Sequence, residues 1–209
     1  QADADLMLGG LTTPYPESLR TVLEVIGPAE GVRRIAGMFM VLRRKEVYFL
    51  ADCAVNTDPD AETLAEIALL SATAVRSLGI EPRVAMLAFS NLGSVDHPLA
   101  HRVRRATEIV RQREPRLTIE GEVQPMTALD RELRERYFPF SELRQNANVL
   151  IFPDLQSGHL ALHLLELLGD VITVGPLLMG TRRPVHLLQF GRSVQDVVNL
   201  AALATVQAR

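Results

Sequence analysis

Apolar runs of strand length alternate with a segment of helical periodicity through the second half of the chain. Residues 83–89, 117–120 and 148–152 are short runs typical of buried strands, and residues 98–113 have the pattern of an amphipathic helix. The run at 148–152 is expected to be a central strand. This alternation predicts an α/β fold of three layers, αβα, with a largely parallel sheet and helices on both faces.

The first half of the chain predicts smaller units. A short strand that ends in glycines is expected over residues 1–10, and a helix with one apolar face over residues 17–26. Two apolar runs, 37–42 and 47–51, are joined by the charged residues 43–46. Charges at the junction of two apolar runs predict a β-hairpin.

A further helix is expected to begin near Asp58. Its carboxylate can cap the helix, and Pro59 suits the first helical position. An apolar stripe follows, and Gly79 is a suitable end because glycine tolerates the left-handed conformation there.

Residues 184–199 form the most informative segment. They predict a short buried strand, a turn at Gly191, and a helix that Ser193 caps, with Asp196 at the third helical position. A strand that leads into a helix N-terminus is a common place to hold an anion. A merely well-capped terminal helix explains the same pattern, and the residues by themselves leave both interpretations open.

The loop after the strand at 83–89 has a similar layout. It carries Ser90, Asn91, Gly93 and Ser94 and precedes the helix at 98–113. Backbone N–H groups and hydroxyls in such a loop can face an anion. By itself this signal is weak.

Two clusters of basic or imidazole side chains have simpler explanations than ligand binding. For the arginines between residues 101 and 116 a solvated helix face is the favoured interpretation. His159 and His163 have H-x-x-x-H spacing, but no acidic or cysteine companion is apparent nearby in the sequence. We therefore expect a hydrogen bond of His159 at a helix start, and no metal site.

Composition narrows the class of protein. The 209 residues are 47% hydrophobic with a net charge of −3, enough for one sizeable core or for one domain plus part of another. A near-neutral balance argues against nucleic-acid binding, and no apolar run reaches the roughly 18 residues of a membrane span. The lone cysteine, Cys53, is expected in the core of a cytoplasmic protein. Because the chain begins with Gln1, we expect a fragment of a longer protein.

The 184–199 segment resembles the C-terminal signature of phosphate acetyltransferases, P-V-N-D-L-S-R-G-x-S-V-x-D-I-V-N. The shared positions are Pro184, Val185, Leu188, Gly191, Ser193, Val194, Asp196, Val198 and Asn199. Two positions depart from it, because Gln189 stands where the family has its catalytic serine and Phe190 where it has an arginine. The motif P-V-H-x-L-Q resembles that of one branch of the family, the C-terminal phosphotransacetylase-like domain of bacterial NADP-dependent malic enzymes.

Other segments extend the resemblance over essentially the whole chain. The stretch from Cys53 resembles the family's D-C-A-x-N-P, the loop at 90–94 its F-S-T-G-G-S, and residues 153–159 its P-D-L-N-S-G-N. On the same resemblance Arg20 takes the place of a family arginine near the acyl-phosphate or CoA pocket. A surface helix charge explains Arg20 equally well.

The resemblance implies a fold and its division. We expect a truncated phosphate acetyl/butyryltransferase-like fold, similar to isocitrate and isopropylmalate dehydrogenases. Residues 26–175 would form its second lobe, and residues 1–25 and 176–209 remnants of the first. Gly175 and Pro176 would mark the crossing between the lobes, and the second lobe would form a homodimer or part of a larger homo-oligomer.

The resemblance also implies a function. We expect a domain that senses acetyl-CoA without transferring acetyl groups, in a parent whose malic-enzyme domain uses NADP and a divalent metal. An active phosphate acetyltransferase, acting on acetyl phosphate and CoA, and a purely structural dimerisation domain are the alternatives. The candidate acetyl-CoA or anion-binding residues are Arg20, Ser90, Asn91, Gly93, Ser94, Gln189, Phe190, Arg192 and Asp196. No catalytic residue and no metal ligand is assigned.

Overall fold

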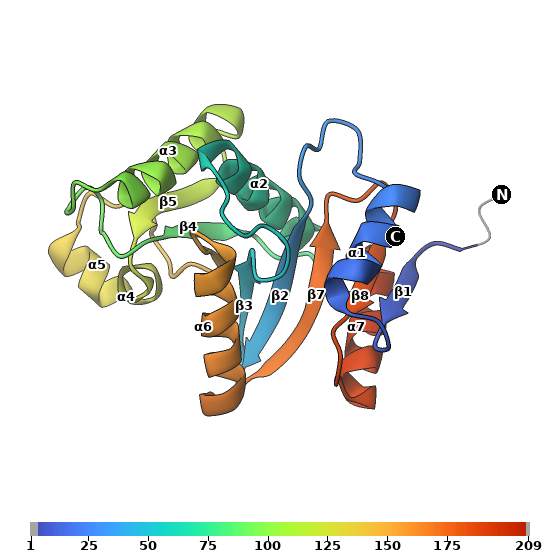
Figure 1. The fold of residues 1–209 in the computed structure, drawn as a ribbon. Helices are drawn as coiled ribbons and strands as arrows, with labels where there is room; N and C mark the ends of the chain where they lie inside the picture. The colour runs from blue at the N-terminus through green and yellow to red at the C-terminus, as the bar shows by residue number, and fades with distance from the viewer. Residues whose placement is uncertain (1–3, 208–209) are drawn as a thin grey trace.

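The computed structural model describes residues 4–207 and contains two β-sheets with helices around them (Figure 1). In chain order the elements are β1 (Met7–Gly10), α1 (Tyr15–Val25), β2 (Ala36–Arg43), β3 (Glu46–Ala51), α2 (Ala61–Ser77), β4 (Arg83–Leu87), α3 (Pro98–Arg113), β5 (Thr118–Val123), α4 (Pro125–Leu129), α5 (Arg131–Tyr137), β6 (Val149–Ile151), α6 (Leu155–Leu168), β7 (Ile172–Met179), β8 (Val185–Leu188) and α7 (Val194–Gln207).

The larger sheet has six strands in the order β5-β4-β6-β3-β2-β7. Strands β5, β4, β6 and β3 run parallel to one another, whereas β2 pairs antiparallel with both β3 and β7. The predicted hairpin at 37–51 and the central position of β6 are therefore confirmed. The smaller sheet is the parallel pair β1–β8.

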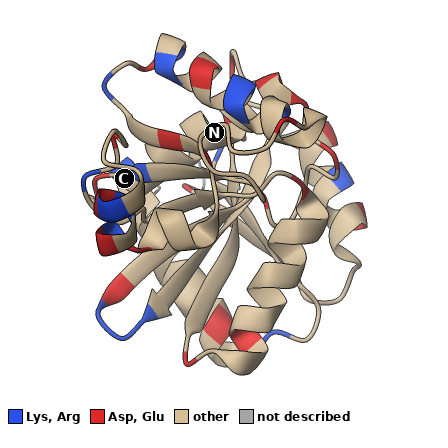
Figure 2. Ribbon diagram, turned by 90° about the vertical axis from the view of Figure 1, so that its left-hand side faces the viewer, with Lys and Arg blue, Asp and Glu red and all other residues tan. Residues whose placement is uncertain are grey.

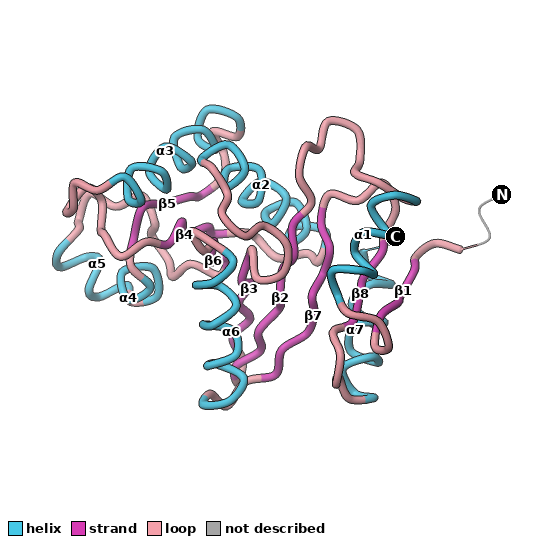
Figure 3. Tube along the Cα trace, in the orientation of Figure 1, coloured by secondary structure: helices cyan, strands magenta, loops and turns pink. Residues whose placement is uncertain are grey.

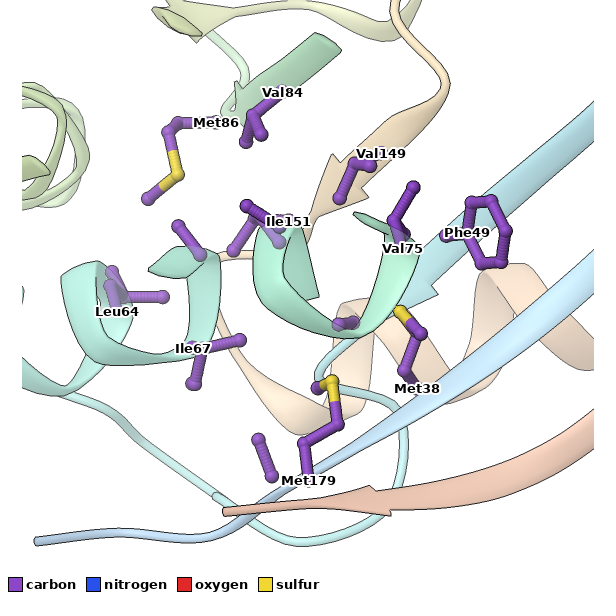
Figure 4. Close-up of a cluster of buried hydrophobic side chains, with 14 of the residues drawn as sticks. Met38, Phe49, Leu64, Ile67, Val75, Val84, Met86, Val149, Ile151 and Met179 are labelled. Carbon is purple, nitrogen blue, oxygen red and sulfur yellow. The ribbon is translucent and has the colours of Figure 1, made fainter. Parts of the chain in front are cut away.

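Alternation along the strands divides the core into two faces. In β4, Val84 and Met86 pack toward α2 and α3, whereas Ala85 and Leu87 belong to the opposite cluster, which contains Leu162 of α6. Figure 4 shows the first cluster, with α2 packed against residues of β4, β6 and β3. The three-layer αβα prediction is confirmed (Figure 1). Cys53 is fully buried, as expected.

The smaller sheet is attached through β7. Leu188 of β8 and Leu200 of α7 join the core cluster of the larger sheet, while Val22 of α1 packs with Val185 and Leu187 on the other side. Helices α1 and α7 therefore flank the β1–β8 pair (Figure 1). The predicted strand over residues 1–10 is β1, and residues 1–3 lie outside the described residues.

Two local predictions differ from the structure. The cap of α2 is Asp60, whose carboxylate accepts a hydrogen bond from the Thr63 N–H at 2.8 Å, while Asp58 pairs with Arg102 instead. Pro59 therefore precedes the cap, and the helix begins at Ala61.

The second difference concerns the expected crossing at Gly175 and Pro176. Val174 and Leu177, on either side of this pair, both pair with β2 across a shift in register, so the chain stays in the larger sheet to Met179. The turn toward the smaller sheet follows β7. The division into lobes at 26–175 stays a prediction.

Charged residues of both signs are interspersed along the ribbon (Figure 2), in keeping with the net charge of −3. Among residues 4–207 no helix is long and apolar enough to cross a membrane.

Candidate functional site

The carboxyl ends of β1 and β8 place two loops side by side. Gly10 is in register with Leu188, and the Leu11 N–H donates to the Leu188 carbonyl at 3.4 Å. The loop before α1 and the loop at 189–193 therefore leave the same edge of the smaller sheet, and α1 and α7 both begin there. Two helix N-termini at one strand edge provide backbone donors for an anion.

The start of α7 is built as the sequence predicts. Gly191 has a φ of 80°, in the left-handed region that favours glycine. The Ser193 N–H donates to an Asp196 carboxylate oxygen at 2.8 Å, and the Asp196 N–H donates back to the Ser193 hydroxyl at 3.2 Å. This reciprocal capping box occupies Asp196 in holding the helix start.

Arg192 extends from the loop toward α6 and β2. Its guanidinium donates to Glu166 at 3.0 Å and to the side-chain oxygen of Gln189 at 3.1 Å, and it lies 5.8 Å from the Phe39 ring centre. The side chains of Arg192 and Glu166 are only 16% and 19% exposed. Phe190, by contrast, is 81% exposed. The loop thus presents an aromatic ring to solvent, while its cation is neutralised internally.

Glu166 on α6 is the centre of this cluster. It also accepts from the Thr173 hydroxyl at 2.6 Å and lies 3.1 Å from Nδ1 of His163. Burial raises the pKa of Glu166, but the hydrogen bonds from Thr173 and Arg192 outweigh burial and leave the pKa below its usual value. His163 therefore has an acidic neighbour three residues further along α6, and the expectation that none lies nearby is wrong.

The loop at 90–94 forms a second cluster around a different carboxylate. The Ser90 hydroxyl donates to Glu122 at 3.0 Å and the Gly93 N–H at 2.8 Å. The Ser94 hydroxyl accepts from the Asn91 N–H at 2.9 Å. The hydroxyl and N–H donors expected to face an external anion are therefore used by an internal one.

Arg104 completes this second cluster. Its guanidinium makes two hydrogen bonds of 3.0 Å to Glu122, whose side chain is 0% exposed. Burial raises the pKa of Glu122, but the hydrogen bonds from Arg104, Gly93 and Ser90 together leave it below the usual value. Arg111 donates one hydrogen bond of 2.9 Å to the nearly buried Glu120, so the arginines of α3 are not simply a solvated face.

The predicted site residues lie in separate groups. Ser90, Asn91, Gly93 and Ser94 follow β4, whereas Gln189, Phe190, Arg192 and Asp196 follow β8, beyond the opposite end of the larger sheet (Figure 3). Four strand spacings separate β4 from β7, roughly 19 Å. Arg20 is exposed on α1 and makes no ion pair within residues 4–207.

Sequence reasoning missed Glu122 and Glu166. Both carried a signal, since Glu122 stands inside the strand β5 and Glu166 follows Leu164 and Leu165 in an apolar helix. A carboxylate among apolar neighbours is rarely buried without a partner.

Comparison with known proteins defines the class. The family model for phosphate acetyl/butaryl transferases matches residues 1–205, and the chain belongs to that family. A phosphotransacetylase from Streptococcus pyogenes has the same fold, with a TM-score of 0.93 and 38% identity over 98% of this chain and 63% of that chain.

Two kinds of curated relatives are similar to the chain. The NADP-dependent malic enzyme of Escherichia coli is 41% identical over 100% of this chain and 28% of its own length. The phosphate acetyltransferase of Bacillus subtilis is 38% identical over 98% of this chain and 64% of its own length. The chain thus spans less than a third of the malic enzyme and less than two thirds of the acetyltransferase. The predicted resemblance to both is confirmed.

Proposed function

We propose that this chain is a regulatory domain that binds acetyl-CoA and does not itself transfer acetyl groups. The observation that carries the proposal is the loop at 189–192. Gln189 and Phe190 offer neither a hydroxyl nor a charge, and the one cation, Arg192, is neutralised by Glu166.

Acetyl transfer to CoA would need polar groups at the developing charge. A base must take the thiol proton, and cations or hydroxyls must stabilise the acyl phosphate in the transition state. Loss of one such group typically lowers the rate by about 10²–10³-fold. Asp196 and Ser193 are occupied by the helix cap, so this loop has few other polar side chains that could take the role of a missing catalytic group.

Binding has weaker requirements than catalysis. CoA carries phosphates that suit the helix N-termini at the β1–β8 edge, and its pantetheine and adenine can contact an exposed ring such as Phe190. Bound acetyl-CoA would change the activity of a malic-enzyme domain in the same chain through a coupling free energy. That catalytic domain would use NADP and a divalent metal, in the cytoplasm.

A homodimer through the second lobe is part of the proposal. Helix α6 carries leucines at i, i+4, i+7 and i+8 that are each more than half exposed: Leu160, Leu164, Leu167 and Leu168. A stripe of this spacing suits a partner helix face. A monomer mass by light scattering at micromolar concentration would contradict it.

The test uses the full-length parent protein. Malate oxidation is measured with and without acetyl-CoA for wild type, Phe190→Ala and the matched variant Phe140→Ala, which removes an exposed ring at the other end of the larger sheet. We expect the acetyl-CoA response to weaken in Phe190→Ala and to persist in Phe140→Ala. A wild type that ignores acetyl-CoA would overturn the proposal.

An active phosphate acetyltransferase is the second candidate, favoured by the similarity to the Bacillus subtilis enzyme. Thiol consumption from CoA and acetyl phosphate separates the two functions. We expect no turnover above background. Turnover that disappears in Asp196→Ala would establish the second candidate instead.

A further inference from the structure

The rings of His159 and His163 on α6 meet in a T-shaped, edge-to-face contact. Their Nε2 atoms are 3.1 Å apart, and the ring centres are 4.4 Å apart with the planes at 83°. One turn of helix separates the two residues, so both rings lie on the same face.

The outer nitrogen of each ring faces a group that only accepts hydrogen bonds. Nδ1 of His163 lies 3.1 Å from a carboxylate oxygen of Glu166, and Nδ1 of His159 lies 3.4 Å from the backbone carbonyl of Cys53. With the hydrogen on Nδ1 of each ring, both outer contacts are satisfied and the two Nε2 atoms lie 3.1 Å apart with no hydrogen between them. Either a shared proton or a metal ion can fill that position.

We propose that His159 and His163 form a binding site for a divalent transition-metal ion of the Zn²⁺ class. Zinc–nitrogen bonds of 2.0–2.1 Å at a tetrahedral angle place two nitrogens about 3.3 Å apart, close to the observed separation. A small rotation of either ring reaches that value. Imidazole nitrogens favour Zn²⁺, Ni²⁺, Co²⁺ or Cu²⁺ over the oxygen-seeking Mg²⁺ and Ca²⁺.

The surroundings match the outer shell of a metal site. Metal-binding histidines usually donate their second N–H to a carboxylate or a backbone carbonyl, and here each has one of the two. Residues 4–207 contain no cluster of three or more histidine, cysteine or acidic side chains placed to hold a metal. Water would complete the coordination, and the 43% exposure of the His163 side chain leaves room for it.

The chain supplies its own matched control. His97 and His101 of the α3 region have the same i, i+4 spacing, but Nδ1 of His97 accepts from the Leu99 N–H and Nε2 of His101 pairs with Asp96. Spacing without converging nitrogens should not bind. The comparison therefore tests geometry and not histidine content.

The experiment titrates Zn²⁺ into the full-length protein after removal of metal, by calorimetry at pH 7.5. We expect the wild type to bind one more Zn²⁺ ion per chain than the His159→Gln/His163→Gln double variant. Zinc sites elsewhere in the full-length protein are present in both and do not affect this difference. Either single variant should lose roughly tenfold or more in affinity, and His101→Gln none. Glu166→Gln should lose about tenfold, as outer-shell changes do.

Two results would overturn the proposal. One is Zn²⁺ binding that is unchanged in both single variants. The other is no added ion up to millimolar Zn²⁺, with ¹⁵N spectra that show a proton on one Nε2, because the pair then shares a proton only. The readout does not depend on acetyl-CoA, so this proposal and the proposed function can fail separately.

Discussion

Two carboxylates organise opposite ends of the molecule, and their differences are instructive. Glu122 binds Arg104 and the hydroxyl of Ser90, while Glu166 binds Arg192 and the hydroxyl of Thr173. Each carboxylate thus accepts hydrogen bonds from an arginine and a hydroxyl group, but the Glu122 side chain is 0% exposed and that of Glu166 is 19% exposed.

The partners also come from different places. Those of Glu122 lie on the loop and helix that follow the neighbouring strand β4, so the cluster is internal to the larger sheet. Arg192 reaches Glu166 from the loop of the smaller sheet. The first cluster joins β5 to the loop and helix that follow its neighbouring strand, whereas the second joins α6 of the larger sheet to the loop after β8 of the smaller sheet.

The largest expected effect comes from Glu122→Gln. The carboxylate accepts four hydrogen bonds, and the amide would turn a donor toward the donors of Arg104 or Gly93. We expect a loss of about 3 kcal/mol in the free energy of unfolding, measured by urea denaturation. Because the pKa of Glu122 is below its ordinary value of 4.5, its contribution is present above pH 4.5 and lost as the pH falls below it. A loss under 1 kcal/mol at pH 7 would contradict this view.

The next effect is a pH dependence of the smaller sheet. Burial lowers the pKa of His186 in β8 to about 4, although the nearby Gln207 side chain acts in the opposite direction. The unfolded chain takes up this proton near pH 6.5 and the folded chain only near 4, so stability falls as the pH drops between these values. We expect a loss of about 2 kcal/mol between pH 7 and pH 5.

His186→Asn is the control for that loss. Asparagine can still accept from the Leu178 N–H, as Nδ1 of His186 does at 3.1 Å, but it does not titrate. The difference between the two proteins' stability–pH curves isolates the histidine. Parallel curves would show that His186 does not cause the loss.

Glu166→Gln is the matched counterpart of Glu122→Gln and should cost less. The amide oxygen can still accept from Thr173, and Arg192 can reach water once its ion pair is lost. We expect a loss of about 1 kcal/mol. If the two substitutions lower the free energy of unfolding equally in urea denaturation, the Glu122 and Glu166 clusters do not differ in rigidity.

The smallest stability effect is expected from Asp196→Ala, about 1 kcal/mol through loss of the helix cap. Ser193→Ala removes the other half of the same capping box at a similar cost. A weaker response of malate oxidation to acetyl-CoA in Asp196→Ala, but not in Ser193→Ala, would assign the carboxylate to ligand binding. Equal responses in both variants and the wild type would place Asp196 outside the site.

Local patterns determined much of the fold. The alternation of apolar runs predicted the three layers, and α3 begins at Pro98 and ends at Arg113 as the periodicity indicated. The turn at Gly191 and the capping box at Ser193 were also predicted, because they depend on residues close in sequence. The family followed from the same local motifs.

Only the tertiary structure decided what the charged residues do. Glu122 is paired with a loop 29 residues away and Glu166 with an arginine 26 residues away, and no local pattern encodes such separations. The strand order then placed the loops after β4 and β8 at opposite ends, although their sequences have the same layout. A sequence specifies which side chains can bind an anion, but the packing of distant elements decides whether an internal carboxylate already occupies the donors.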